Sequence, residues 1–230
     1  MSTLLLVRHG QASFGSGDYD RLCDAGIRQS RILGVHLARE GRLPHAVLSG
    51  SLRRQQETAR HTLSAAGHDL PITVSQAFDE YPGDALLAAY LPIAARDPEV
   101  AAAGDGLRRN RRLFQTALST VMELWLSGAE GFAGESWTAF RARVSGGLEQ
   151  AVAGRGRDEL VAIFTSGGVI GTAVGAVLGL APEKAITLSW RIHNASVTEI
   201  HYGRSGFSLA GFNAVAHLRL AAGGTLLTYR

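Results

Sequence analysis

The chain alternates between short apolar runs and stretches in which apolar residues have helical spacing. Residues 4–7 (LLLV) and 160–164 (LVAIF) are continuous apolar runs, and residues 46–48 (AVL) form a shorter one. Runs of this length without alternation are typical of strands covered on both faces, as in a parallel sheet between helices. We therefore predict three buried strands at these positions.

Helical patterns follow each of the three runs. Residues 24–41 predict a helix that ends near Gly41. After the second run the chain turns into another helix, for which we predict Ser51 as the N-cap and Arg54 in the first turn. After the third run, TSGG interrupts an uncharged stretch that extends to residue 181. We interpret that stretch as a strand, a glycine turn and a buried helix.

The middle of the chain departs from this alternation. Apolar residues at 107, 114, 118, 121 and 125 predict an amphipathic helix of about five turns. The four-residue spacing from Phe140 to Val152 predicts another helix with one face in the core. Because residues from about Phe78 to Trp137 contain no strand pattern, we expect a mostly helical insertion over an edge of the sheet.

Three short β-type patterns follow Lys184. They occupy residues 185–192 (AITLSWRI), 195–202 (ASVTEIHY) and 207–212 (FSLAGF), and they predict strands on the far side of the same sheet. Together with the earlier elements, they predict one α/β domain over residues 1–230 with a doubly wound, mostly parallel sheet.

Composition narrows the function classes. With 46% hydrophobic and 19% charged residues, the 230-residue chain is an ordinary globular protein, and we expect it to be soluble and cytoplasmic. A net charge of +3 does not favour a nucleic-acid partner. The uncharged stretch of residues 160–181 could span a membrane by length, but TSGG divides it, so we expect no membrane span. The single cysteine, Cys23, excludes an intrachain disulfide.

Chemically distinctive residues come directly after the three predicted strands. The motifs are RHG, SGSLRRQQETA and TSGG, in chain order. Because the carboxyl ends of parallel strands can meet at one crevice, we expect Arg8, His9 and Arg54 to lie together near a helix N-terminus. Guanidinium groups and helix N–H groups bind phosphate, and a neutral imidazole among them can attack phosphorus. The stretch FDEYPGDALL then supplies candidate acids in Asp79, Glu80 and Asp84.

The ordered motifs LVRHGQ, SGSLRRQQETA, FDE, SGGVI and FNAVAHL resemble the histidine phosphatase superfamily, which includes the cofactor-dependent phosphoglycerate mutases. The resemblance spans nearly the whole chain. It implies a phosphoglycerate mutase-like, three-layer α/β sandwich whose helical insertion lies over the active-site edge. It also implies a small phosphorylated substrate. No metal-ligand spacing such as HExxH occurs, so we expect no metal and no other cofactor.

The resemblance assigns roles to individual residues. His9 is expected to be the phosphorylated nucleophile, with Arg8 and Arg54 as phosphate clamps and Glu80 as the general acid. Asp79 remains an alternative acid. Three further residues of the matching motifs are expected to contact the substrate: Gln11, Gly167 and His217.

One position departs from the family pattern. Family members usually carry a second histidine before the two glycines of the late motif, where this chain has Ser166. Three interpretations follow: Ser166 suffices, His193 or His217 substitutes for the missing histidine, or the protein binds phosphoesters without turnover. FDEY in place of the mutase-type acid segment NER favours a phosphatase over a phosphoglycerate mutase.

A cluster of arginines lies in the predicted insertion. It could bind a polyanion, but no aromatic residues are interspersed, so we interpret it as a solvated helix face. Its members are Arg108, Arg109, Arg111 and Arg112.

Overall fold

The computed structural model describes residues 2–13 and 20–229, without the side chains of Asp105 and Arg108. The chain divides into two compact units. One comprises Met1–Glu80 and Val144–Arg230, and the other comprises Tyr81–Arg143. The first unit contains the sheet and most of the residues expected at the active site.

The sheet of the first unit has six strands in the order β3-β2-β4-β1-β5-β6. The first four strands in that order run parallel to one another, β5 pairs antiparallel with β1, and β6 pairs antiparallel with β5. The strands are β1 (Ser2–Arg8), β2 (Ala46–Ser49), β3 (Ile72–Val74), β4 (Leu160–Thr165), β5 (Val197–Gly203) and β6 (Gly206–Ala214). This is the predicted α/β fold with a mostly parallel sheet.

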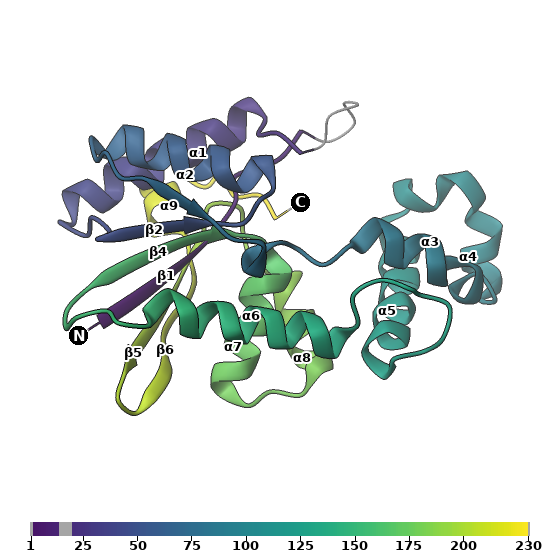
Figure 1. Cartoon of the computed structure of the whole chain (residues 1–230). Coiled ribbons are helices and arrows are strands. Elements are labelled where there is room, and N and C mark those ends of the chain that lie inside the picture. Colours follow the sequence, from purple (N-terminus) through teal and green to yellow (C-terminus); the bar gives the residue numbers. More distant parts are fainter. Residues whose placement is uncertain (1, 14–19, 230) are drawn as a thin grey trace. The chain divides into compact units, whose positions relative to one another are not determined.

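Helices cover both faces of this sheet (Figure 1). One face carries α1 (Asp24–Arg39), α2 (Arg53–Ala66) and α9 (Ala216–Ala222). The other carries α7 (Gly167–Leu178) and α8 (Pro182–Ser189). Helix α6 (Trp137–Val152) begins in the second unit and ends in the first.

The two central strands are buried on both faces, as their continuous apolar runs predicted. All six residues of β4 and residues 3–7 of β1 are buried. Leu5 and Val7 of β1 pack in a core that includes Leu33 of α1 and Leu63 of α2. Because these strands cannot shift without exposing apolar side chains, they hold the residues at their carboxyl ends in fixed positions.

The prediction of a strand at residues 185–192 was wrong. Pro182–Ser189 form helix α8, with a proline in the first turn where its missing N–H is tolerated. The helix packs closely on α7, because a Cβ on Gly171 would lie 2.6 Å from the Ala185 carbonyl oxygen. The β-branched residues of this stretch suggested a strand, but helix–helix packing overrides that weak preference. The strands predicted at residues 195–202 and 207–212 are confirmed as β5 and β6.

Helix α2 begins one residue later than predicted. Leu52 is its N-cap, and the Leu52 backbone N–H donates to Gln55 Oε1 at 3.2 Å. Ser51 instead donates its hydroxyl to Asp79 Oδ2 at 2.6 Å. Arg54 still lies in the first turn.

The second unit is mostly helical, as predicted. It contains α3 (Gly83–Ala94), α4 (Pro98–Ala103), a 3-10 helix (Gly104–Arg109) and α5 (Arg111–Ser127). The ring of Trp125 lies 5.3–5.7 Å, centroid to centroid, from three other aromatic rings: Tyr81, Trp137 and Phe140. That this helical insertion lies over the active-site edge of the sheet stays a prediction.

The amphipathic helix of about five turns predicted in this unit is α5, but Leu107 lies outside it, in the 3-10 helix. Asn110 caps α5 by accepting from the Leu113 N–H at 3.2 Å, which separates it from the 3-10 helix. The buried stripe begins at Leu113 rather than Phe114, so Phe114 and Leu118 are only half-buried.

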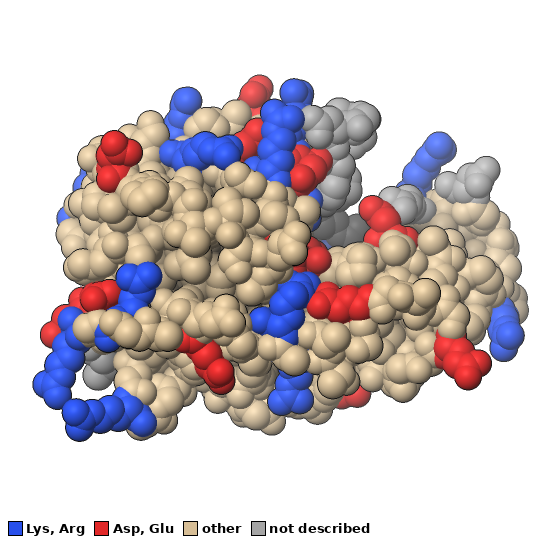
Figure 2. Space-filling view, viewed as in Figure 1, with Lys and Arg blue, Asp and Glu red and all other residues tan. Residues whose placement is uncertain are grey.

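The described side chains of the arginine cluster, Arg109, Arg111 and Arg112, are exposed to solvent. Arg112 pairs with Glu99 at 2.5 Å, and both side chains are largely exposed. The Arg108 side chain lies outside the described part of the structure. On the face visible in Figure 2, basic side chains gather at the lower left and at the top, with acidic side chains beside them.

Two kinds of feature are absent from residues 2–13 and 20–229. No helix there combines the length and apolar character needed to cross a membrane. No group of three or more histidine, cysteine, aspartate or glutamate side chains is arranged to hold a metal ion.

Candidate active site

His9 lies directly after β1 and is only 5% exposed. Its backbone N–H donates to the Thr165 carbonyl of β4 at 2.8 Å, and its carbonyl accepts from the Asn194 side-chain amide at 3.0 Å. The next residue must be glycine, because a Cβ on Gly10 would lie 2.5 Å from the Gly26 carbonyl oxygen of α1. The close approach of α1 to the end of β1 thus fixes the backbone beside His9.

Hydrogen bonding sets the tautomer of His9. Nδ1 lies 2.7 Å from the Gly10 carbonyl oxygen, which can only accept, so Nδ1 carries the proton. Nε2 therefore has the lone pair, and Arg54 Nε donates to it at 3.3 Å. The imidazole presents its unprotonated nitrogen to a guanidinium group that could hold a phosphate.

The surroundings keep His9 neutral. Burial lowers the pKa of its imidazole well below 6.5, and the charges of Arg54 and Arg8 lower it further. The hydrogen bond to Gly10 acts in the opposite direction and is the smaller effect. At physiological pH the ring is unprotonated, which is the form that can attack phosphorus.

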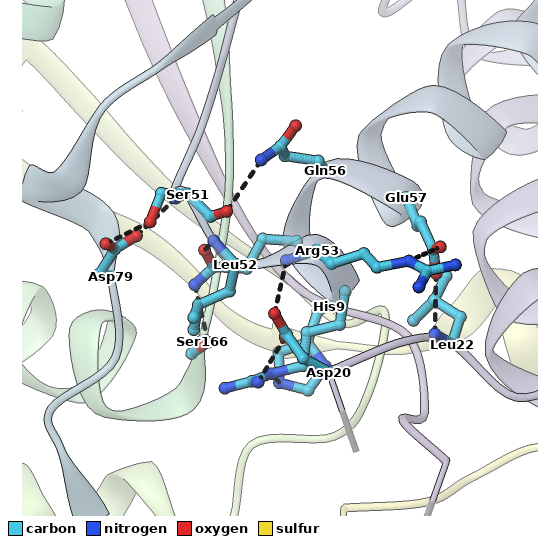
Figure 3. Close-up of polar contacts among 12 residues, drawn as sticks. His9, Asp20, Leu22, Ser51, Leu52, Arg53, Gln56, Glu57, Asp79 and Ser166 are labelled. Carbon is cyan, nitrogen blue, oxygen red and sulfur yellow. Dashed lines mark hydrogen bonds and ion pairs between the residues drawn. The ribbon is translucent and has the colours of Figure 1, made fainter. Parts of the chain in front are cut away.

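Arg54 is already bound to an anion of the chain itself. Its Nη1 lies 2.7 Å from Asp20 Oδ1. Asp20 Oδ2 also accepts from the Arg53 backbone N–H at 2.9 Å (Figure 3). The Asp20 carboxylate thus lies on a guanidinium group and on the N-terminus of α2, two groups that favour negative charge.

The guanidinium group of Arg8 is held by two backbone carbonyl groups. Its Nη1 donates to the carbonyl oxygens of Ile192 and Tyr229, the latter at 3.2 Å. The guanidinium group also approaches the start of α7, since a Cβ on Gly167 would lie 3.8 Å from Arg8 Nε. The structure therefore brings Arg8, the N-terminus of α7 and, through Thr165, His9 to the same edge of the sheet.

Ser166 is fully buried at the N-cap of α7, next to the residue that pairs with the His9 backbone. Its hydroxyl oxygen accepts from Gln55 Nε2 at 2.8 Å. Gln55 is also fully buried, and the same amide nitrogen donates to the Phe78 carbonyl at 3.1 Å. The position that is usually histidine in the family is thus occupied by a serine, which is bonded to a glutamine.

The two candidate acids have different surroundings. Asp79 accepts from both the backbone N–H and the hydroxyl of Ser51, so it holds the loop before α2. Glu80 Oε2 accepts from the Gly168 backbone N–H at 3.0 Å, which fixes its carboxyl group at the N-terminus of α7. Glu80 is therefore the acid nearer to the N–H groups of α7 that could bind phosphate. Asp84, in the second unit, lies in the first turn of α3.

Three other candidate residues, Gln11, His217 and His193, have hydrogen bonds to other parts of the chain. The backbone N–H of Gln11 donates to Gln29 Oε1 at 2.8 Å. His217 is 4% exposed, and its Nε2 lies 2.9 Å from the Ala195 carbonyl oxygen. The backbone N–H of Ala195 donates to the carbonyl oxygens of Arg8 and His9. His193 is half-buried with Nδ1 3.3 Å from Asn213 Oδ1, and its ring contacts that of Tyr229.

Several residues that support the site were missed from sequence. They are Asp20, Gln29, Gln55, Asn194 and Thr228. Most are neutral amide or hydroxyl side chains without a motif, and they meet the site through contacts between distant segments. Gln55 alone had a local signal, because it lies one residue after Arg54.

Comparisons with known proteins give a family match and several structures of similar fold. The model of the histidine phosphatase superfamily (branch 1) matches residues 4–215. Sequence comparison with curated proteins gave no match.

Solved structures with a similar fold include phosphatases and a mutase. YhfR of Bacillus stearothermophilus is 20% identical, with a TM-score of 0.68, and the match covers 95% of this chain and 100% of that one. Phosphoserine phosphatase of Entamoeba histolytica with phosphoserine is 17% identical, with a TM-score of 0.65 and coverage of 95% and 100%. Phosphoglycerate mutase of Bacillus anthracis is 19% identical, with a TM-score of 0.63 and coverage of 94% and 95%.

Proposed function

Because the chain belongs to the histidine phosphatase superfamily, we propose that it is a phosphohydrolase that cleaves a small phosphomonoester through phosphorylated His9. The observation that carries the proposal is the state of His9. Its ring is buried and neutral, it has its proton on Nδ1, and Arg54 lies 3.3 Å from its reactive nitrogen. This arrangement suits nucleophilic attack on a phosphorus atom.

The first step transfers the phosphoryl group to the protein. His9 Nε2 attacks phosphorus, the bond from phosphorus to the ester oxygen breaks, and the carboxylic acid of Glu80 gives its proton to the leaving oxygen. Arg8 and Arg54 stabilise the charge on the three non-bridging phosphoryl oxygens. Substrate phosphate would displace the Asp20 carboxylate from Arg54, since both bind the same guanidinium group. It would also take the hydrogen bond of Arg54 Nε from His9 Nε2, which frees the lone pair for the attack.

The second step returns the enzyme to its starting state. The Glu80 carboxylate takes a proton from water, the water oxygen attacks the phosphohistidine, and the bond from phosphorus to Nε2 breaks. Inorganic phosphate leaves and Glu80 is again protonated. Glu80 is preferred to Asp79 for this role because both Asp79 oxygens accept hydrogen bonds from Ser51.

Ser166 contributes a neutral hydroxyl where the family usually has a second histidine. Its oxygen accepts from Gln55, so its proton is directed away from that amide and can be donated to a phosphoryl oxygen. Removing one such donor from an enzyme typically costs about 10²–10³ in rate, so a neutral replacement leaves a slower enzyme.

The substrate class follows from the few charged groups of the site. Two arginines and a helix N-terminus match one phosphate monoester dianion. Proteins of similar fold have been solved with phosphoserine and with 3-phosphoglyceric acid bound. We propose a small phosphorylated metabolite of this size as the substrate, with no nucleic-acid partner.

Trapping the phosphorylated intermediate tests the proposal. Quenching a reaction with ³²P-labelled phosphomonoesters should leave an acid-labile, base-stable phosphate on the protein. His9→Ala should abolish both the label and turnover. His201→Ala is a matched control, because this imidazole pairs with Glu199 on β5. Undiminished turnover in His9→Ala would exclude the mechanism.

A phosphoester-binding module is the second candidate, and the neutral Ser166 is the observation that favours it. In that case wild-type protein would show no turnover on a broad phosphoester panel, yet calorimetry would detect inorganic phosphate binding that Arg54→Ala removes. Phosphoglycerate mutase activity is the third candidate. Isomerisation of 3-phosphoglycerate without net phosphate release would identify it.

A further inference from the structure

We propose that Thr228 is a positioning residue that holds the nucleophile loop, residues 8–11, in its reactive geometry. The proposal rests on the proposed function, since it assigns His9 as the reacting group. Thr228 is distant from His9 in the sequence and lies in the last described segment of the chain. Its hydroxyl group bonds two buried side-chain amides, one on each side of the loop.

The first connection runs through Gln29 of α1, which is fully buried. Gln29 Oε1 accepts from the Gln11 backbone N–H at 2.8 Å, on the far side of Gly10 from His9. Gln29 Nε2 donates to Thr228 Oγ1 at 2.9 Å and to the Leu226 carbonyl at 2.8 Å. Both hydrogens of this amide are therefore used by residues 226–228, which orients its oxygen toward the loop.

The second connection runs through Asn194, which is also fully buried. Asn194 Nδ2 donates to the His9 carbonyl at 3.0 Å, and Asn194 Oδ1 accepts from the Thr228 hydroxyl at 3.0 Å. The Asn194 backbone N–H donates to the Thr228 carbonyl at 2.7 Å. Thr228 thus fixes the orientation of the amide that holds the His9 backbone.

A single hydroxyl can serve both amides only because it donates to one and accepts from the other. Valine has nearly the same shape but can do neither, so Thr228→Val would leave one buried amide hydrogen and one buried amide oxygen without partners. Unpaired buried polar groups are costly, and the two amides would turn toward other partners. The hydrogen bonds to Gln11 and His9 would then weaken together.

The neighbouring residue extends the same connection to the phosphate clamp. The Tyr229 carbonyl accepts from Arg8 Nη1 at 3.2 Å. Residues 226–229 therefore hydrogen-bond the two amides that hold the nucleophile loop and also Arg8 itself. A change in this segment should affect the chemical step more than the global fold.

Kinetics on p-nitrophenyl phosphate test the proposal. We expect Thr228→Val to lower kcat about tenfold with KM within twofold, as is typical when a buried partner of an active-site group is removed. Thr228→Ser keeps the hydroxyl and should retain kcat within twofold. The matched control is Thr225→Val, because Thr225 is exposed and its hydroxyl bonds only the nearby Ala222 carbonyl among the described residues. It should behave as wild type.

Hydrogen–deuterium exchange of the peptide covering residues 8–12 provides a readout that needs no turnover. Exchange should be faster in Thr228→Val than in wild type, and unchanged in Thr228→Ser and Thr225→Val. If wild type proves inactive, the proposed function fails, and exchange alone still decides the role of Thr228. Wild-type kcat and exchange in Thr228→Val would overturn the inference. So would an equal loss in Thr228→Ser, because the hydroxyl would then not be the cause.

Discussion

At the level of single residues, the proposed chemistry depends on where individual protons lie. The Gly10 carbonyl oxygen accepts a hydrogen bond from His9 Nδ1–H, so Nε2 keeps its lone pair. Burial and two neighbouring cations then prevent protonation of that nitrogen. Glu80 is the proposed proton source, held at the N-terminus of α7 by the Gly168 N–H. A neutral nucleophile and a nearby acid are the two groups that phosphomonoester cleavage through a phosphohistidine requires.

The role of Glu80 can be separated from that of Asp79 by leaving-group dependence. Glu80→Gln should reduce kcat/KM about 10²–10⁴-fold for an alkyl phosphate, because the alkoxide needs a proton as it leaves. Its effect on p-nitrophenyl phosphate should be much smaller, since nitrophenolate leaves without protonation. Steady-state kinetics on both substrates gives the comparison, with Asp79→Asn as the matched variant. Equal losses on the two substrates would contradict the assignment.

At the level of helices and strands, the site depends on contact between α2 and α7. Gln55 in the first turn of α2 donates to Ser166, the N-cap of α7, at 2.8 Å, and both residues are fully buried. The same amide nitrogen reaches the Phe78 carbonyl, just before the acid segment. The two helices therefore meet through a glutamine that fills space beside a small N-cap residue.

This contact predicts the outcome of restoring histidine at position 166. Ser166→His alone should not raise turnover, because the imidazole needs space that the Gln55 amide occupies. Adding Gln55→Ala removes that obstacle, and the double variant should exceed Ser166→His about tenfold in kcat/KM, since a cation near the phosphoryl oxygens stabilises the transition state. Measuring both single variants and the double variant completes the cycle. Higher turnover in Ser166→His alone would show that Gln55 does not limit the site.

At the level of the whole molecule, burial in the fold favours the neutral form of His217 and His9. Burial lowers the pKa of His217 to about 4 despite its hydrogen bond to Ala195, and its ring stacks on that of His36 at 5.5 Å. Burial also lowers the pKa of His9 well below 6.5. Both histidines therefore bind protons more readily in the unfolded chain than in the folded one.

These shifts predict how stability depends on pH. Because the folded-state pKa is depressed, the contribution of His217 is fully present above pH 6.5 and is lost as the pH falls toward 4. The shift from 6.5 to about 4 corresponds to about 3 kcal/mol of unfolding free energy. Urea unfolding at pH 7 and pH 4.5 should show most of this loss in wild type and a smaller loss in His217→Gln. An equal loss in the variant would contradict the assignment to His217.

Much of this fold and part of its candidate site could be predicted from the sequence, because the relevant signals are local. Continuous apolar runs identified β1, β2 and β4, and the residues directly after them, including His9 and Arg54, were named as site candidates. Local patterns failed where packing decided the outcome. Residues 185–189 form a helix because they pack on the glycine-containing face of α7.

How those residues are held, and in which protonation state, depends on contacts that form only in the folded chain. The tautomer of His9 and the pairing of Gln55 with Ser166 depend on distances within a folded site. The links from Thr228 to Gln29 and Asn194 join segments 199 and 34 residues apart. Amide and hydroxyl side chains can each donate and accept hydrogen bonds, so any two of them can pair once folding brings them together. Their positions in the sequence therefore show no distinctive spacing. Residue types and their local order therefore identify which groups could react, whereas folding selects the buried partners that prepare them.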